Sequence, residues 1–258
     1  MIDTKTNREL FIAKAAAWQK ADPLFTVQDI MGATAVFSGS STDTFNVLAL
    51  EPNAKRSTVE TVDHARRSVF GADNRFAIWS WEEGQLDDLT PLLGAAEENL
   101  VMSATLESRV PQKPKIALTV THATSSAHLA AAGTVLAEIF GENEEGFMVQ
   151  SIYMAQEEAA VKNLPLQYLV AYEDGGPIAT GSFLLTGDTA SIFDVAVRPS
   201  LQGKGIGSAM FEAVFDAATD AGAKNFTLQA TADGAGIYER AGFKKLGSCW
   251  CLDFAEPQ

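Results

Sequence analysis

FDVAVRPSLQGKGIG, residues 193 to 207, carries the strongest pattern in this chain. A run rich in valine ends at Pro199, and glycines follow at every second position from Gly203 to Gly207. Apolar residues then recur at helical spacing between Ile206 and Ala221. The pattern predicts a strand, a glycine loop and a helix in direct succession.

The glycine loop has the composition of an anion site. Without Cβ atoms, its backbone N–H groups are open to a ligand at the start of a helix, where the helix dipole also favours negative charge. A Walker loop would end in Gly-Lys-Ser/Thr, but Gly207 is followed by Ser208 and Ala209. A dinucleotide loop would need Gly-x-Gly-x-x-Gly, and the third glycine is missing here. The spacing therefore excludes two common types of phosphate loop.

The second half of the chain predicts an α/β fold, with a mixed sheet and helices on its faces. A helix capped by Ser125 is expected up to Phe140, and Gly141 to Gly146 is expected to break the helical pattern. The predicted strands are 116–121, 166–172, 178–186, 191–197, 226–230 and 243–252, and the further helices are 156–162, 206–221 and 234–240.

Two motifs in this half resemble those of the GNAT acetyltransferase superfamily. Gln202, Gly205 and Gly207 satisfy the pattern Gln/Arg-x-x-Gly-x-Gly/Ala, and a second signature, IYERAGF, occupies residues 237 to 243. Either motif alone is weak, but the two at this distance are highly specific. The resemblance covers residues 115 to 253 and implies an acyl-CoA N-acyltransferase fold.

The resemblance also implies coenzyme A contacts along the strand and the loop. In this family the loop amides bind the pyrophosphate, and the pantetheine arm pairs with the strand before the loop, which splays from its neighbour. Acetyl-CoA is therefore the expected cofactor, and no metal ion is expected because the histidines lack ligand spacing. The residues matched to the cofactor are Val195, Ala196, Val197, Gln202, Gly203, Lys204, Gly205, Ile206, Gly207 and Ser208.

Two further residues are candidates for proton transfer. An alkylamine with a pKa of about 10.4 is neutral in about one molecule in 2,500 at pH 7, so an attacking amine needs a proton acceptor. Asp194 is the candidate base, with a structural or solvent-exposed carboxylate as the alternative. Tyr238 matches the family's general-acid tyrosine, with mere packing on the cofactor as the alternative. Residues 231–233, Thr-Ala-Asp, depart from the Asn that some members carry there.

The first half reads as a degenerate copy of the same fold. Placing Pro52 on Pro199 aligns residues 45–52 with residues 192–199, and later elements follow at matching spacing. Asn53 to Arg56 stands where the glycine loop should be. The alternative is an unrelated α/β domain with a similar rhythm. The predicted later elements are a helix at 58–70, a strand at 76–81, a helix at 86–93 and a strand at 100–106.

We therefore predict tandem GNAT folds in one chain. The first lobe, 1–110, is expected to be degenerate, 111–115 to be a linker, and 116–258 to be the catalytic domain. The lobes would form a pseudo-dimer within a monomer, or the chain would form a homodimer.

The composition limits the classes of partner that the chain is expected to bind. The net charge of −14 disfavours nucleic acid and could attract a cationic acceptor. No apolar run approaches the roughly 20 residues of a membrane span, and no signal-peptide core occurs at the start, so a cytoplasmic location is expected. Cys249 and Cys251 share one face of a predicted strand and are expected to be buried or partly buried thiols.

The expected function is acetyl transfer from acetyl-CoA to a primary amine, on a small molecule or a peptide, by direct attack. The alternative is a non-catalytic acyl-CoA-binding sensor or regulatory module. His122 is a weaker candidate for the acceptor pocket, whereas His64 and His128 are expected on helix surfaces.

Overall fold

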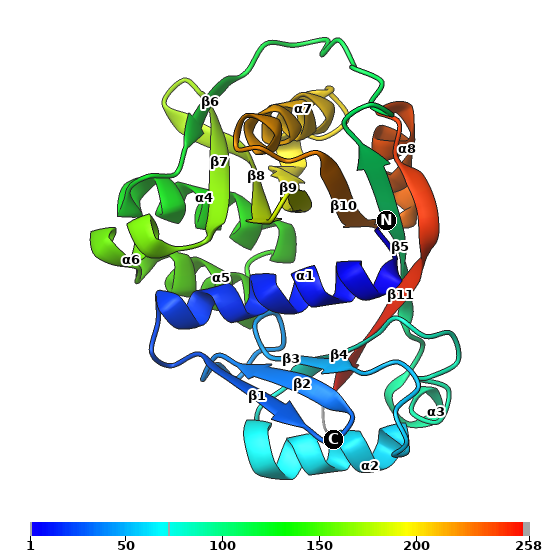
Figure 1. The fold of residues 1–258 in the computed structure, drawn as a ribbon. Coiled ribbons are helices and arrows are strands. Elements are labelled where there is room, and N and C mark those ends of the chain that lie inside the picture. Colours follow the sequence, from blue (N-terminus) through cyan, green and yellow to red (C-terminus); the bar gives the residue numbers. More distant parts are fainter. Residues whose placement is uncertain (1, 72, 255–258) are drawn as a thin grey trace. The chain divides into compact units, whose positions relative to one another are not determined.

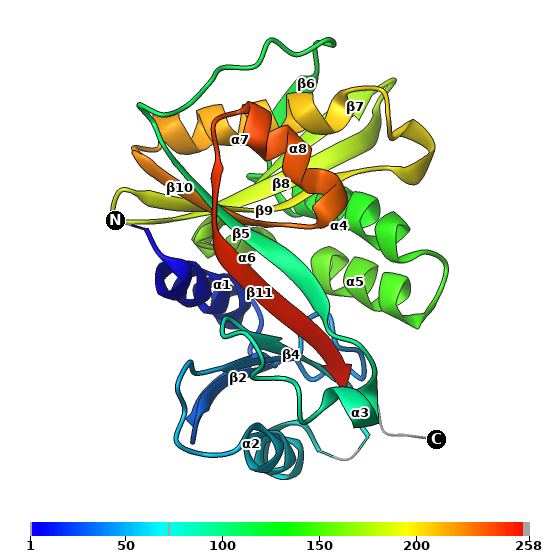
Figure 2. The same ribbon diagram turned by 90° about the vertical axis from the view of Figure 1, so that its right-hand side faces the viewer.

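The computed structural model describes residues 2–71 and 73–254, which divide into two compact units. Unit 1 contains the described residues up to 101, together with 229–232 and 245–254, and unit 2 contains residues 102–228 and 233–244. Figures 1 and 2 show the elements of both units. None of the helices within the described ranges is long and apolar enough to cross a membrane.

Unit 2 is a mixed sheet with helices on both faces. Its elements are β6 (Thr119–His122), α4 (Ser126–Phe140), α5 (Glu144–Met154), α6 (Glu158–Asn163), β7 (Leu166–Glu173), β8 (Gly176–Thr186), β9 (Thr189–Val197), η3 (Pro199–Leu201), α7 (Ile206–Asp220), β10 (Asn225–Ala230) and α8 (Ala232–Arg240). Strands β6 to β9 are antiparallel, and β10 runs parallel to β9. Helices α4 and α5 lie side by side on one face of these strands, and α7 covers the other (Figures 1 and 2).

Most elements of unit 2 lie close to their predicted positions, but α5 corrects the prediction. Asn143 caps this helix by accepting a hydrogen bond from the N–H of Gly146 (3.0 Å), so Gly146 lies in the first turn. A Cβ atom on Gly146 would lie 2.1 Å from the carbonyl oxygen of Gly141. Glycine is needed here because two backbone segments approach closely. The predicted break after Phe140 is present but shorter than predicted, because α5 already begins at Glu144.

From α1 onward, the order of helices and strands in unit 1 resembles that of unit 2, without counterparts of β6, α5 and α6. Its elements are α1 (Thr4–Ala17), η1 (Trp18–Lys20), β1 (Thr26–Ile30), β2 (Ala33–Phe37), β3 (Val47–Leu50), α2 (Thr58–Ala65), η2 (Arg66–Phe70), β4 (Phe76–Ser80) and α3 (Thr90–Leu93). Strands β1 to β3 are antiparallel, and β4 is parallel to β3 across the α2 crossover. Strands β7 to β9, helix α7 and strand β10 have the same connectivity.

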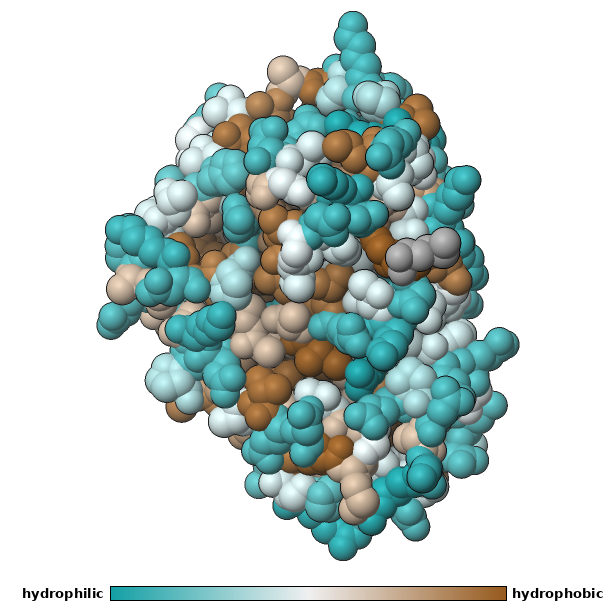
Figure 3. Space-filling view, in the orientation of Figure 1, coloured by the Kyte–Doolittle hydropathy of each residue, from teal (hydrophilic) through white to brown (hydrophobic). Residues whose placement is uncertain are grey.

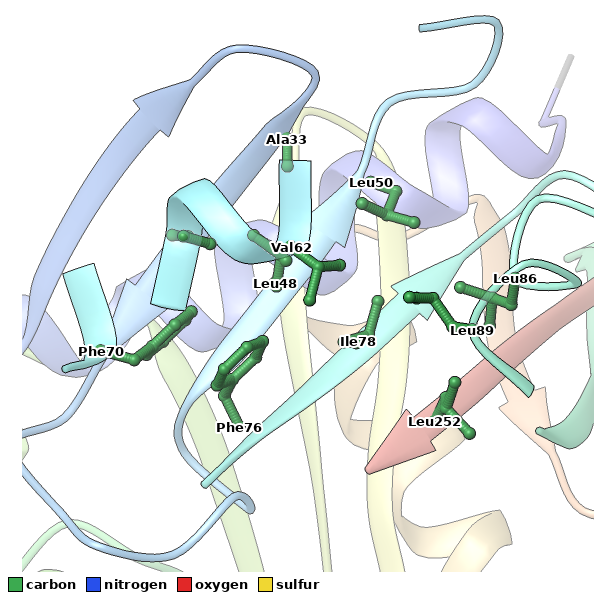
Figure 4. Packing of buried hydrophobic residues seen from close by; sticks show 12 residues of the cluster. Ala33, Leu48, Leu50, Val62, Phe70, Phe76, Ile78, Leu86, Leu89 and Leu252 are labelled. Atoms are coloured by element: carbon green, nitrogen blue, oxygen red, sulfur yellow. The ribbon is translucent and has the colours of Figure 1, made fainter. Parts of the chain in front are cut away.

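The core of unit 1 gathers buried residues from these strands and from α2 (Figure 4). Phe70 and Phe76 stack with ring centroids 4.2 Å apart, and Ile78 belongs to the same cluster. Leu252, from the last strand of the chain, also lies in this cluster. Burial of each large side chain contributes about 1.5–3 kcal/mol to the hydrophobic stabilisation of this core.

Hydrophilic residues prevail on the surface over α2 and α3 (Figure 3).

Three strands are divided between the units: β5, β11 and β10, whose last two residues, Gln229 and Ala230, belong to unit 1. β5 (Glu97–Thr105) begins in unit 1 and ends in unit 2, whereas β11 (Lys244–Phe254) begins in unit 2 and ends in unit 1. β11 pairs with β4 over Trp250–Phe254, and the Thr227 hydroxyl of β10 donates to the carbonyl oxygen of Met102 in β5 (3.0 Å). The final strand of each predicted half therefore ends in the other compact unit.

This exchange differs from the predicted domains 1–110 and 116–258. The predicted boundaries group each final strand with the elements that precede it, whereas the compact units do not. The physical reason is that alternation along a segment shows that it is a strand but not which strand lies beside it. Residues 111–115 have no regular secondary structure.

Candidate active site

The candidate site forms where β9 parts from β10. The two strands pair in parallel, Thr189–Ile192 against Asn225–Leu228. Within residues 2–71 and 73–254 this ladder extends no further, although β9 continues to Val197. The predicted pantetheine-binding segment, Val195 to Val197, lies beyond the last paired residue. On its other side this segment still pairs with β8.

A β-bulge lies at the point of divergence. Thr180 pairs with Ala196 and Ser182 with Phe193, so that β9 has one residue more than β8 over this interval. Asp194 has a φ of 56°, in the left-handed region that Asp tolerates better than most residues. A bulge bends its strand and increases the local twist. The divergence of β9 from β10 therefore coincides with a local deformation of β9.

The glycine loop gives its three glycines two different roles. Gly203 and Gly205 have φ values of 76° and 88°, which strongly favour glycine. Gly207 has an ordinary helical conformation, and a Cβ atom on it would meet Val197 at 3.6 Å and Ile237 at 3.9 Å, which are normal contact distances. The backbone therefore requires the first two glycines, whereas the third leaves the first turn of α7 bare.

The amides at the start of α7 fit an anionic ligand. Gly205 is the N-cap and has no side chain to accept from them. Among the described residues, the N–H groups of Ile206, Gly207 and Ser208 have no backbone acceptor, and the ladder begins with Ala209 N–H donating to Gly205 (3.2 Å). Open donors at the positive end of a helix dipole suit a pyrophosphate. The residues present therefore fit coenzyme A.

The loop is connected to the end of β9. Gln202 is exposed, and its Nε2 donates to the carbonyl oxygen of Val197 (3.2 Å). Lys204 is exposed, and a Cβ atom on Gly205 would lie 3.9 Å from Cβ of Lys115. The structure thus brings the predicted strand and loop residues together in unit 2.

Tyr238 lies on α8, close to the start of α7. Its ring packs edge-on against Phe211 of α7, with centroids 5.1 Å apart, and Phe243 lies 6.2 Å away. The preceding residue, Ile237, is one of the two side chains beside Gly207. Burial raises the pKa of Tyr238 to about 12, so its hydroxyl is protonated at neutral pH. The group is in the state that a proton donor requires.

Asp194 is held by hydroxyl groups from two neighbouring strands. Tyr168 of β7 and Ser182 of β8 both donate to Oδ2 of Asp194, at 3.1 Å and 3.0 Å. The hydroxyl of Tyr153, on α5, lies 2.6 Å from that of Tyr168. Burial, followed by the charge of Asp194, raises the pKa of both tyrosines well above 10. A carboxylate with oriented donors can accept a proton at a defined place.

Sequence reasoning did not single out Tyr153, Tyr168 or Ser182. A signal existed in the predicted hairpins, because antiparallel register places Tyr168 opposite Ser182, and Ser182 opposite Phe193 beside Asp194. Tyr153 could not be found in this way, since it belongs to the helix that was missed.

The remaining candidate residues lie in varied surroundings. His122 is exposed at the end of β6, His64 is exposed on α2, and His128 is half-buried on α4. Cys249 is buried and Cys251 partly buried in β11, both as free thiols, which confirms the prediction. Burial raises the pKa of Cys249 to about 12, so this thiol is unreactive near neutral pH.

Comparison with known proteins agrees with this geometry. Residues 165–245 match the family model described as an acetyltransferase (GNAT) domain. A 122-residue stretch is 25% identical to the uncharacterized N-acetyltransferase YjcF of Bacillus subtilis (strain 168), covering 47% of this chain and 87% of that protein.

Two solved structures show the fold over a larger part of the chain. A GCN5-related N-acetyltransferase from Kribbella flavida is 14% identical, with a TM-score of 0.67 over 99% of this chain and 96% of the other. A tandem GNAT protein from the clavulanic acid biosynthesis pathway is also 14% identical, with a TM-score of 0.58 over 92% and 86%. Residues 165–245 therefore belong to the GNAT acetyltransferase domain family, and the chain has a mixed α/β fold of the tandem GNAT type.

Proposed function

We propose that this chain transfers an acetyl group from acetyl-CoA to a primary amine of a small molecule or a peptide. The observation that carries the proposal is the parting of β9 from β10 directly before a helix start with open amides. Membership of residues 165–245 in an acetyltransferase domain family supports the same reaction class. Bound acetyl-CoA would supply a thioester carbonyl carbon for attack by the amine.

Two parts of unit 2 would hold the cofactor. The amides of Ile206, Gly207 and Ser208 would donate to the pyrophosphate, in the manner of helix N-termini that bind phosphate. The backbone of Val195 to Val197 would pair with the pantetheine arm on the side that β10 leaves open. Gln202 would keep the loop close to this strand through its hydrogen bond to Val197.

Two side chains would move the protons. Asp194 would accept the proton that the amine loses as the N–C bond forms, and Tyr238 would donate its hydroxyl proton to the sulfur as the C–S bond breaks. Direct attack needs no covalent intermediate on the protein. The raised pKa of Tyr238 and the hydroxyl donors around Asp194 support these roles.

A thiol-release assay tests the proposal. Acetyl-CoA is offered with a panel of a polyamine, an aminoglycoside, free amino acids and a lysine-containing peptide, and mass spectrometry identifies the acetylated amine. We expect thiol release that depends on at least one amine. Tight binding of acetyl-CoA by calorimetry without turnover of any amine would favour the sensor, and absence of binding would contradict both functions.

A further inference from the structure

The Asp194 carboxylate has support that reaches across three strands and into a helix. Tyr168 lies opposite Ser182 in the β7–β8 pair, and Ser182 lies opposite Phe193 in the β8–β9 pair. The bulge then places Asp194 within hydrogen-bonding distance of both hydroxyls. Both donors converge on the same oxygen, Oδ2. Two donors on one oxygen restrict rotation of the carboxylate about its side-chain bonds.

The direction of the hydrogen-bond chain follows from proton counting. A tyrosine hydroxyl carries one proton, and Tyr168 gives its proton to Asp194. The contact of 2.6 Å between the two tyrosines then requires Tyr153 to be the donor and Tyr168 the acceptor. The chain therefore runs from Tyr153 through Tyr168 to Asp194. Both tyrosine side chains are buried, so water does not compete freely for these bonds.

The position of Tyr153 is itself fixed by a glycine. A Cβ atom on Gly133 of α4 would lie 2.3 Å from Cβ of Tyr153, a distance that real atoms do not adopt. Glycine at this place lets α5 approach α4 closely enough for Tyr153 to reach Tyr168. Helix α4 is also attached to the end of β9, because Glu138 forms a two-bond ion pair with Arg198. The hydrogen bonds to Asp194 thus lead through Tyr168 to Tyr153 on α5, and α5 packs closely on α4.

We propose that Tyr168 and Ser182 are positioning residues that fix the Asp194 carboxylate for proton transfer, with Tyr153 orienting Tyr168. This inference rests on the proposed acetyltransferase function. The hydroxyls act on catalysis through Asp194, and they do not touch the acetyl donor or the amine. Removing one of them should affect turnover and leave cofactor binding unchanged.

A double-mutant cycle tests the inference on the full chain. The variants are Tyr168→Phe, Asp194→Ala and the double variant, assayed with acetyl-CoA and the best amine of the panel. We expect Tyr168→Phe to lower kcat about tenfold and to change the KM for acetyl-CoA by less than about twofold. In the Asp194→Ala background the same change should alter kcat by less than about twofold, because the group through which it acts is gone.

Two further variants control for structural effects. Tyr172→Phe removes a hydroxyl from the same strand, outside the chain of hydrogen bonds, and should leave kcat unchanged. If Tyr168→Phe does not fold, Ser182→Ala takes its place in the cycle with the same expectation. An equal fall in kcat in both backgrounds would overturn the inference while the acetyltransferase function stands. A wild-type chain that acetylates no amine would overturn both together.

Discussion

The crossover β3–α2–β4 of unit 1 and the crossover β9–α7–β10 of unit 2 have the same connectivity. They differ in how far the two parallel strands of each crossover pair with one another. In unit 1, β3 pairs with β4 as far as Ala49, one residue before the strand ends. In unit 2, pairing with β10 stops at Ile192, while β9 runs on to Val197. A stretch of strand that is unpaired on this side therefore follows Ile192 in the second crossover and is limited to Leu50 in the first.

The end of β3 is also occupied by a side chain. Arg8 of α1 donates from Nε to the carbonyl oxygen of Leu50 (2.7 Å) and from Nη2 to that of Ala49 (3.0 Å). With Pro52 placed on Pro199, these residues match Val197 and Ala196 of β9. In unit 1 both carbonyl groups therefore accept from the buried side chain of Arg8, whereas in unit 2 the carbonyl oxygen of Val197 accepts from Gln202 of the glycine loop (3.2 Å).

The loops before α2 and α7 also differ in whether the protein itself supplies acceptors for their backbone N–H groups. In unit 1 the N–H of Asn53 donates to Glu82 (2.6 Å), and Ser57 caps α2 by accepting from the N–H of Glu60 (3.2 Å). A carboxylate and a serine hydroxyl thus accept from backbone N–H groups before and at the start of α2. In unit 2 the N-cap is Gly205, which offers no side-chain acceptor. Backbone N–H groups without an acceptor inside the protein can donate to an anionic ligand. Those that already have an acceptor are not available for this.

From this comparison we propose that the first lobe does not bind coenzyme A through its loop and that each chain has one cofactor site. Internal partners at β3 and at Asn53 support the proposal.

The largest effect is expected from separating the halves at the predicted boundary. A fragment of residues 111–258 lacks the part of β5 beside β10 and also lacks Arg109, which pairs with Glu212 (2.5 Å) and Asp216 (2.8 Å). Burial raises the pKa of Glu212 although Arg109 opposes the rise. Leaving this buried carboxylate unpaired costs about 3–5 kcal/mol, a large part of a typical stability of about 5–15 kcal/mol. We expect the fragment to be insoluble or unfolded by circular dichroism.

Co-expression of residues 1–110 with this fragment provides the control. Because each piece then supplies the strand that the other needs, we expect recovery of a soluble, folded complex. A fragment of residues 111–258 that folds alone and binds coenzyme A would contradict the exchange of strands between the units.

The next effect is expected from giving the α7 loop a carboxylate, as unit 1 has at Glu82. Gly207→Asp places a negative charge among the open amides, where it competes with the pyrophosphate. We expect the Kd for coenzyme A to rise about 100-fold, or about 2.7 kcal/mol, by calorimetry. Gly207→Ala is the matched control and should change the Kd by less than about threefold, because its Cβ meets only normal contacts. Equal weakening by both variants would show that bulk, not charge, matters.

A smaller effect is expected from the proton donor. Tyr238→Phe should lower kcat by about 10- to 100-fold and leave the Kd for coenzyme A unchanged, since the ring still packs on Phe211. Because burial raises the pKa of Tyr238 to about 12, the group stays protonated as the pH rises from 7 to about 10. The pH profile of kcat should therefore show no loss from this residue below about pH 10. A descending limb below that pH, absent in the variant, would contradict the role.

The second half of the fold was predictable because its elements carry local signals. Valine-rich alternation, the glycine loop and the Ser125 cap specify β9, the start of α7 and α4 without reference to distant residues. Helix α5 was not predicted because glycine in a sequence usually indicates a break in a helix. Gly146 is instead needed for its close approach to Gly141, and this contact cannot be inferred from the local sequence.

The strand exchange and the part of Tyr153 in holding Asp194 were not predictable for a related reason. β11 reads correctly as a strand, but its pairing with β4 depends on residues more than 160 positions earlier in the chain. Hairpin register could have linked Tyr168 through Ser182 to the neighbourhood of Asp194. Tyr153 lies on α5, and no spacing in the sequence relates it to the other two. Residues matched to the cofactor were accessible to sequence because loop and strand are contiguous.

The smallest effect is expected at the cap of α2, where the comparison is most direct. Ser57→Ala removes the acceptor for the Glu60 N–H, which should lower the free energy of unfolding by about 1 kcal/mol in a urea titration. It opens one donor at the start of α2, but Glu82 still occupies Asn53 and Arg8 still occupies the end of β3. The calorimetric stoichiometry should therefore remain one coenzyme A per chain, with an unchanged Kd. A second binding event in this variant would mean that the serine cap alone had closed the first lobe.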